Sequence, residues 1–163
     1  MSEDKDLVQS GSKELLPSDI FEQLLKSIHE RKKLPRTYVG GESVLDAEEW
    51  SQVEEWLSKK ANIVDIVAKG IRRRVIGLVH DMSLSPSKTQ THVHYINQYG
   101  ETWGFVLNPN DDFYSGIKDI KEGDFILEDM EGDVPLSIKK LNLSPEHAEK
   151  VLNKIRKAYE KNQ

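Results

Sequence analysis

The hydrophobic positions in the first part of the chain recur at helical spacing. The first apolar stripe follows Pro17 and consists of Ile20, Phe21, Leu24, Leu25 and Ile28. Residues three and four positions apart share one side of a helix, so this stripe predicts an amphipathic helix. Asp19 and Glu22 have the spacing of a capping box, which predicts that the helix begins at Asp19.

A second helix is predicted to begin near Asp46, whose capping partner would be Glu49. Its apolar side consists of Trp50, Val53, Trp56 and Leu57. Asn62 would cap a third, short helix that ends at Gly70. Because residues 63–67 are mostly Ile and Val, a strand is an open alternative there.

After Gly70 the pattern changes to short runs that are rich in β-branched and aromatic residues. These runs predict strands at 71–80, 89–96, 101–107, 125–128 and 135–141. The segment 108–116, between the third and fourth of these strands, is predicted to be a loop. Pro135 at the first position of the last strand is typical of a strand at the edge of a sheet.

The last predicted helix is capped by Ser144 and has Pro145 in its first turn. Its apolar stripe consists of Ala148, Val151, Leu152, Ile155 and Ala158, and its other side is basic. This stripe packs either on the same domain or against a second copy of the chain in a homodimer. The sequence leaves both interpretations open.

Together these elements predict a single α+β domain over residues 17–163. It would comprise N-terminal helices in 17–70, a central antiparallel meander of four to five strands in 71–143, and a C-terminal amphipathic helix in 144–161. The small sheet would be either an open sheet or an OB-like barrel. Residues 1–16 are polar and are predicted to form a flexible N-terminal tail.

The hairpin around Gly100 can close in two registers. A four-residue loop at 97–100 would place His94 opposite Trp103. A three-residue loop at 98–100 puts Gly100 at the position that requires a left-handed backbone, and it gathers the large apolar side chains on one face. We therefore predict the second register. Its pairs are Tyr95 with Trp103, Val93 with Phe105, and Thr91 with Leu107.

The chain has 163 residues, of which 37% are hydrophobic and 31% charged, and it contains no cysteine. This is the composition of a folded globular domain, and it excludes a disulfide scaffold and every thiolate site. No apolar run approaches the roughly 20 residues that a membrane span requires, and the polar start does not resemble a secretory signal. We therefore expect a cytoplasmic protein that does not contact a membrane.

The net charge of −5 conceals bands of opposite sign. Residues 26–40, 59–90 and 136–163 carry net charges of +4, +5 and +4, whereas residues 91–135 carry −8. A basic surface can therefore form on an acidic protein if the fold brings the three positive bands together.

The aromatic side of the hairpin has two interpretations. It is either core beneath the helices or an open platform on which unpaired bases stack. Three arginines occupy the neighbouring predicted strand, and alternation places at least one of them on each face. They are either the charged protection of an edge strand or contacts to phosphates. The predicted nucleic-acid-binding residues are Arg72, Arg73, Arg74, Tyr95, Trp103, Phe105, Lys32 and Lys33.

Two further groups of residues are candidates for metal binding. His92 and His94 share one face of a strand about 7 Å apart, and His80 could be a third ligand. Two histidines without a fixed third ligand are usually exposed polar groups, so we expect no metal and no other cofactor. The acids in Asp111–Asp112 and Glu128–Asp133 lack the spacing of a calcium loop and are interpreted as solvated turns.

The sequence contains no phosphate-binding loop, dinucleotide fingerprint or nucleophile motif. Our leading hypothesis is non-enzymatic binding of single-stranded nucleic acid through aromatic stacking and basic side chains. The isoelectric point of 5.6 is lower than that of most nucleic-acid-binding domains. A protein-interaction or adaptor module is the first alternative. A metal-binding or enzymatic site at His80, His92 and His94 is the second.

Overall fold

The computed structural model of the chain describes residues 17–33, 44–59 and 68–163. The predicted tail at 1–16 and most of the predicted third helix lie outside these ranges. The end of that helix lies within them, and Gly70 has a φ of +61°, as expected for a residue that terminates a helix.

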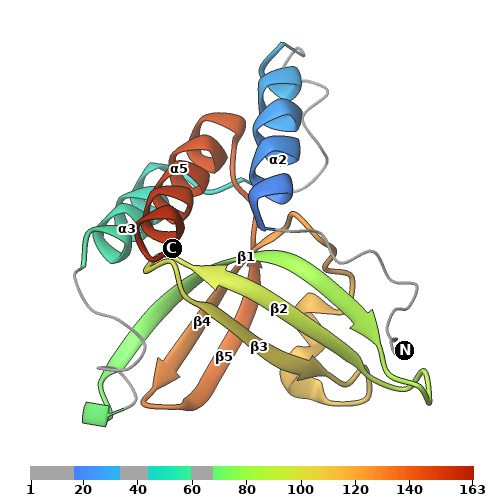
Figure 1. The fold of residues 1–163 in the computed structure, drawn as a ribbon. Coiled ribbons are helices and arrows are strands. Elements are labelled where there is room, and N and C mark those ends of the chain that lie inside the picture. The colour runs from blue at the N-terminus through green and yellow to red at the C-terminus, as the bar shows by residue number, and fades with distance from the viewer. Residues whose placement is uncertain (1–16, 34–43, 60–67) are drawn as a thin grey trace.

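The described residues form one sheet of five antiparallel strands with helices on one face. The strands are β1 (Arg72–Leu84), β2 (Thr91–Asn97), β3 (Thr102–Leu107), β4 (Phe125–Glu131) and β5 (Val134–Leu141). Their order in the sheet is β3-β2-β1-β4-β5, so β1 is central and β4 returns to its free side. The sheet curves into a half-barrel (Figure 1). The α+β prediction is confirmed.

Three helices cover one face of this sheet, which we call the helix face (Figure 1). They are α2 (Pro17–Lys32), α3 (Ala47–Ser58) and α5 (Pro145–Lys161). No helix in the described part of the chain is long and apolar enough to span a membrane.

Of the four predicted helix starts, three lie in the described ranges, and two of these are confirmed. Asp46 and Glu49 form a reciprocal capping box on α3, and the Ser144 hydroxyl accepts a hydrogen bond from the backbone of His147 on α5. The predicted start of α2 is wrong, because this helix begins at Pro17, two residues before Asp19. Proline fits the first turn of a helix, and Asp19 in that turn still interacts favourably with the helix dipole.

The hairpin of β2 and β3 has the predicted three-residue register. The observed pairs include Tyr95 with Trp103, Val93 with Phe105, and Thr91 with Leu107. Gly100 has a φ of +78°, which is the left-handed conformation that the loop requires.

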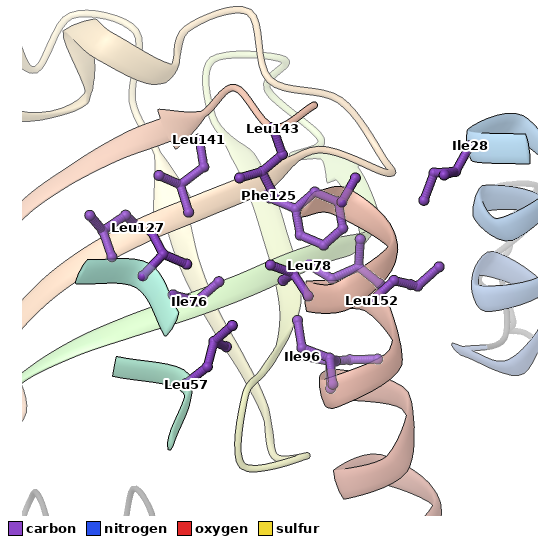
Figure 2. Close-up of a cluster of buried hydrophobic side chains, with 14 of the residues drawn as sticks. Ile28, Leu57, Ile76, Leu78, Ile96, Phe125, Leu127, Leu141, Leu143 and Leu152 are labelled. Carbon is purple, nitrogen blue, oxygen red and sulfur yellow. The ribbon is translucent and has the colours of Figure 1, made fainter. Parts of the chain in front are cut away.

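The main hydrophobic core lies between the helix face and the three helices. From the sheet, Ile76, Leu78, Ile96, Phe125 and Leu127 point toward Leu152 of α5 and Leu57 of α3, as Figure 2 shows. The stripe of α5 is used in this core: Ala148, Val151, Leu152 and Ile155 are all buried. The apolar side of α5 therefore packs on its own domain.

A second core lies on the opposite face of the sheet. A short 3-10 helix, η2 (Asp112–Ile117), sits in the segment predicted to be a loop and packs against β5. We call this side the η2 face. Its buried residues are Val75, Val79, Val93, Tyr95, Leu107, Ile117, Ile120, Ile126, Met130 and Ile138. The aromatic side of the hairpin belongs to this core and not to the one beneath the helices.

Gly77 of β1 makes room for the ring of Tyr95. A Cβ at position 77 would overlap this ring, and Tyr95 is only 1% exposed, so the ring has no free space into which it can move. The ring lies over Gly77 and its hydroxyl donates a 2.5 Å hydrogen bond to Glu128 on β4. A glycine in the centre of a strand is therefore required by a neighbouring side chain.

We expect Gly77→Ala to destabilise the protein by about 1–3 kcal/mol, the usual cost of overpacking a core. Urea unfolding measures the change. Gly116→Ala is the matched control, because a Cβ at position 116 meets nothing closer than 3.8 Å. Equal stabilities of the two variants would contradict this account.

Candidate functional site

Strand β1 is longer than β2, and its first residues have no strand on that side. The β1–β2 pairing begins at Gly77 and Asn97 and runs to Leu84. The side chain of Gln98, which is 1% exposed, takes the place of the missing strand. Its Oε1 accepts a hydrogen bond from the Ile76 amide at 2.9 Å, and its Nε2 donates to the Arg74 carbonyl at 3.0 Å.

A pocket of about 340 Å³ opens beside this overhanging end of β1. Residues from β1, α3 and the hairpin loop line it. They are Glu55, Trp56, Lys59, Arg72, Arg73, Arg74 and Tyr99. The three arginines that the sequence analysis selected therefore meet at one pocket, and a lysine and two aromatic residues join them.

Arg72 and Arg74 are held on the helix face by one buried carboxylate. Asp129 of β4 is opposite Arg74 in the sheet, and its side chain is 7% exposed. The guanidinium of Arg72 lies 3.0 Å from Asp129 Oδ2, and Nε of Arg74 lies 3.3 Å from Oδ1. The hydrogen bond to Asp129 raises the pKa of Arg72. The two cations thus have a fixed orientation at the wall of the pocket.

Arg74 also contacts α3. Its guanidinium carbon lies 5.3 Å from the ring centroid of Trp56, within the range of a cation–π interaction. One arginine therefore links the carboxylate on β4 to the aromatic wall of the pocket.

Arg73 points to the η2 face, as the alternation of the strand requires, and it borders the same pocket from that side, beside Tyr99. It forms no ion pair with any residue in the described ranges. Its Nε and the Tyr99 hydroxyl are both enclosed, and neither has a hydrogen-bond partner in this part of the chain. Burial raises the pKa of Tyr99, and the positive charge of Arg73 opposes this effect. Among the three arginines, Arg73 is thus the one whose charge no described carboxylate compensates.

The loop that carries Tyr99 is fixed by contacts at both ends. The Asn97 side chain accepts hydrogen bonds from the backbone amides of Tyr99 and Glu101. A Cβ at Gly100 would overlap the backbone of α5 at Ala158, so the loop packs directly on this helix. Asn162, just after α5, donates to the Tyr99 carbonyl at 3.0 Å. The pocket therefore lies next to the C-terminal end of α5.

The predicted aromatic platform is not beside the arginines. Trp103 pairs with Tyr95 in the sheet, and Tyr95 pairs with Val79 of β1. Val79 lies six residues along β1 from Arg73, a distance of about 20 Å. Tyr95 is buried, so its ring offers no face to a base. Phe105 is partly exposed and stacks on Tyr114 with ring centroids 5.6 Å apart.

The predicted lysines on α2 lie at the other end of α5. Lys32 pairs with Glu149 in the first turns of α5, whereas the loop that carries Tyr99 is bound by Asn162, after the last turn. A helix of 17 residues is about 25 Å long, so Lys32 and Lys33 do not belong to the pocket.

The three candidate histidines lie near one another without forming a ligand set. His94 Nδ1 is 3.5 Å from the carboxylate of Asp81, its neighbour on β1, and the rings of His80 and His94 are 6.3 Å apart. His92 is exposed. Across the described residues, no group of three or more metal-ligating side chains occurs.

The interpretation of the β4 acids as solvated turns is wrong for two of them. Glu128 and Asp129 are both buried within β4, on opposite faces of the sheet. Glu128 lies among apolar residues and is bound by the Tyr95 hydroxyl. Burial raises the pKa of Glu128, and the hydrogen bond from Tyr95 partly opposes the shift.

The raised pKa of Glu128 gives a pH dependence with a defined sign. The unfolded chain loses this proton near pH 4.5, whereas the folded protein retains it to higher pH, so folding stability falls as pH rises between the two values. Glu128→Gln cannot lose a proton. Its stability relative to the native protein should therefore increase from pH 4.5 upward, as urea unfolding at a series of pH values would measure.

Glu131→Gln is the control, because Glu131 is an exposed acid on the same strand. A pH-independent difference between Glu128→Gln and the native protein would refute the assignment.

Sequence reasoning missed Trp56 and Tyr99. Trp56 was assigned to an apolar helix stripe, and Tyr99 to a turn. The signal that could have found them is the mismatch in length between β1 and β2, which leaves the Arg72–Arg74 edge open beside the hairpin loop.

Comparison with known proteins does not assign this site. No protein-family model matches the chain, and a search of curated proteins finds no significantly similar sequence.

Proposed function

We propose that this protein binds single-stranded nucleic acid at the pocket beside Arg72–Arg74. The observation that supports the proposal is the gathering of four cationic side chains and two aromatic ones around about 340 Å³. This volume is within the range of ligand pockets. Phosphate recognition needs fixed cations, and recognition of an unpaired base needs a flat hydrophobic or guanidinium surface; the pocket has both.

The charge of the pocket favours an anion. Four cations line it, and two carboxylates, Glu55 and Asp129, lie among them, so a net charge of about +2 is left. Asp129 pairs with Arg72 and Arg74 and orients them, whereas the guanidinium of Arg73 is available to pair with a bound anion. An anion entering the pocket therefore meets cations that are already in position, which lowers the entropic cost of binding.

The aromatic residues favour an unpaired base over a duplex. Trp56 and Tyr99 are partly exposed, and their rings would be inaccessible to bases that are stacked inside a double helix. Stacking of one base on an aromatic ring contributes about 1–3 kcal/mol. The alternative function, a protein-interaction or adaptor module, stays a prediction.

We expect Arg73→Ala to weaken binding of a labelled oligothymidylate about tenfold at low salt, the effect of losing one charge-assisted contact. Fluorescence anisotropy measures the dissociation constant. Lys118→Ala removes an exposed charge just after η2, outside the lining of the pocket, and should change the constant less than about twofold.

Two outcomes would overturn the proposal. One is an absence of binding by the native protein at about 50 mM salt, where electrostatic binding is strong. The other is an equal dissociation constant for the native protein and Arg73→Ala. Stacking of a base on Trp56 should also quench the tryptophan fluorescence of the native protein. Loss of this quenching in Trp56→Phe, in which Trp50 and Trp103 remain as internal references, would support stacking at Trp56.

A further inference from the structure

Four lysines of α5 form one exposed row, which we call the lysine stripe. They are Lys150, Lys154, Lys157 and Lys161. Their intervals of four, three and four residues keep them within about 60° of the helix circumference. The buried side of α5 lies on the opposite side of the helix, so the stripe faces away from the core.

The lysines of the stripe form no ion pair with a residue in the described ranges. Two of the three carboxylates of α5 are bound outside the stripe. Glu149 pairs with Lys32 and His29 of α2, and Glu160 pairs with Arg156 of α5 itself. The third, Glu146, lies one turn before Lys150, so the uncompensated positive charge is greatest toward the C-terminal end of the stripe.

The C-terminal end of the stripe lies beside the hairpin loop that carries Tyr99. Lys161 precedes Asn162, whose side chain binds the carbonyls of Tyr99 and Gly100 in the hairpin loop. Tyr99 in turn lines the pocket beside Arg72–Arg74. At its other end the stripe reaches α3, where Lys150 lies 5.9 Å from the ring centroid of Trp50. The row of cations thus starts beside α3 and leads toward the pocket.

We propose that the lysine stripe binds successive phosphates of the same strand whose end occupies the pocket, an inference that rests on the proposed function. The eleven residue steps from Lys150 to Lys161 rise about 16 Å along the helix axis. Phosphates of a stacked strand follow one another about every 3.4 Å, so the stripe spans about five of them. The ligand is therefore an oligonucleotide and not a mononucleotide.

Two carboxylates limit how much of the stripe contributes. Burial and the charge of Lys150 lower the pKa of His147, in the first turn of α5, whereas Glu146 and Glu54 of α3 oppose this shift, so both acids lie near this end of the stripe. The N-terminal end of the stripe is thus near two negative charges, whereas Lys157 and Lys161 lie at the end of α5 that contacts the hairpin loop. We assign the larger part of the phosphate binding to Lys157 and Lys161.

The test compares a short and a longer oligothymidylate of about three and about eight nucleotides at salt concentrations from about 50 to about 200 mM. Replacing both lysines, Lys157→Ala with Lys161→Ala, should reduce the slope of log K against log salt by about 1.4 for the longer strand. Binding of the longer strand should weaken about tenfold at low salt, and binding of the short strand should stay within about twofold.

The control variant, Lys118→Ala with Lys121→Ala, removes two exposed lysines from the η2 segment and changes the net charge equally. It should leave both slopes unchanged. Failure of the native protein to bind either strand overturns the proposed function. Binding of both strands with the same affinity and salt slope in the double variant as in the native protein overturns the lysine stripe alone.

A third outcome also decides the question. If the double variant loses binding to phosphatidylserine vesicles and still binds the longer strand normally, the stripe is a membrane-facing surface and the proposal is wrong. If vesicles do not bind the native protein and the salt slope falls as expected, the phosphate path is supported.

Discussion

Strand β1 is the element on which the other parts of this structure depend. It pairs with β2 on one side and β4 on the other, and its central residues are buried on both faces. The three helices cover one of these faces and the η2 segment packs on the other. Because β1 is longer than β2, its first residues lie beyond the hairpin, and buried backbone groups there need other partners. The side chain of Gln98 supplies two of these hydrogen bonds. The candidate pocket lies beside the first residues of β1, which have no neighbouring strand on this side.

The two buried acids of β4 lie on opposite faces of the sheet, each beside a different hydrophobic core. Glu128 and Asp129 are adjacent, so the alternation of the strand sends them to opposite faces. Asp129 is compensated by two arginines, whereas Glu128 has a neutral partner in Tyr95. An ion pair with a buried carboxylate orients the cation, whereas burial without a cation raises the pKa of the carboxyl group, as it does for Glu128. Asp129 therefore organises the pocket, and Glu128 is a structural residue of the η2 face.

Local basic surfaces form on this acidic protein because specific pairs remove the negative charges around them. The net charge of −5 includes carboxylates that are held in ion pairs, such as Asp129 at the pocket and Glu149 between α2 and α5. What matters for binding an anion is the charge that remains after pairing, at Arg73 and along α5. Charge bands in the sequence cannot reveal this quantity, since the partners lie far apart along the chain.

The sequence by itself determined the local features of this protein. The caps of α3 and α5, the hairpin register and the division of the three arginines between two faces follow from spacing, turn chemistry and alternation, which involve only neighbouring residues. Tertiary structure decided which aromatic residues accompany the arginines, Trp56 and Tyr99 instead of Trp103, and it decided that Glu128 and Asp129 are buried. The physical reason is that both outcomes depend on the pairing of β1 with β2 and β4. Those contacts join segments separated by tens of residues, and no local pattern encodes where one strand ends against another.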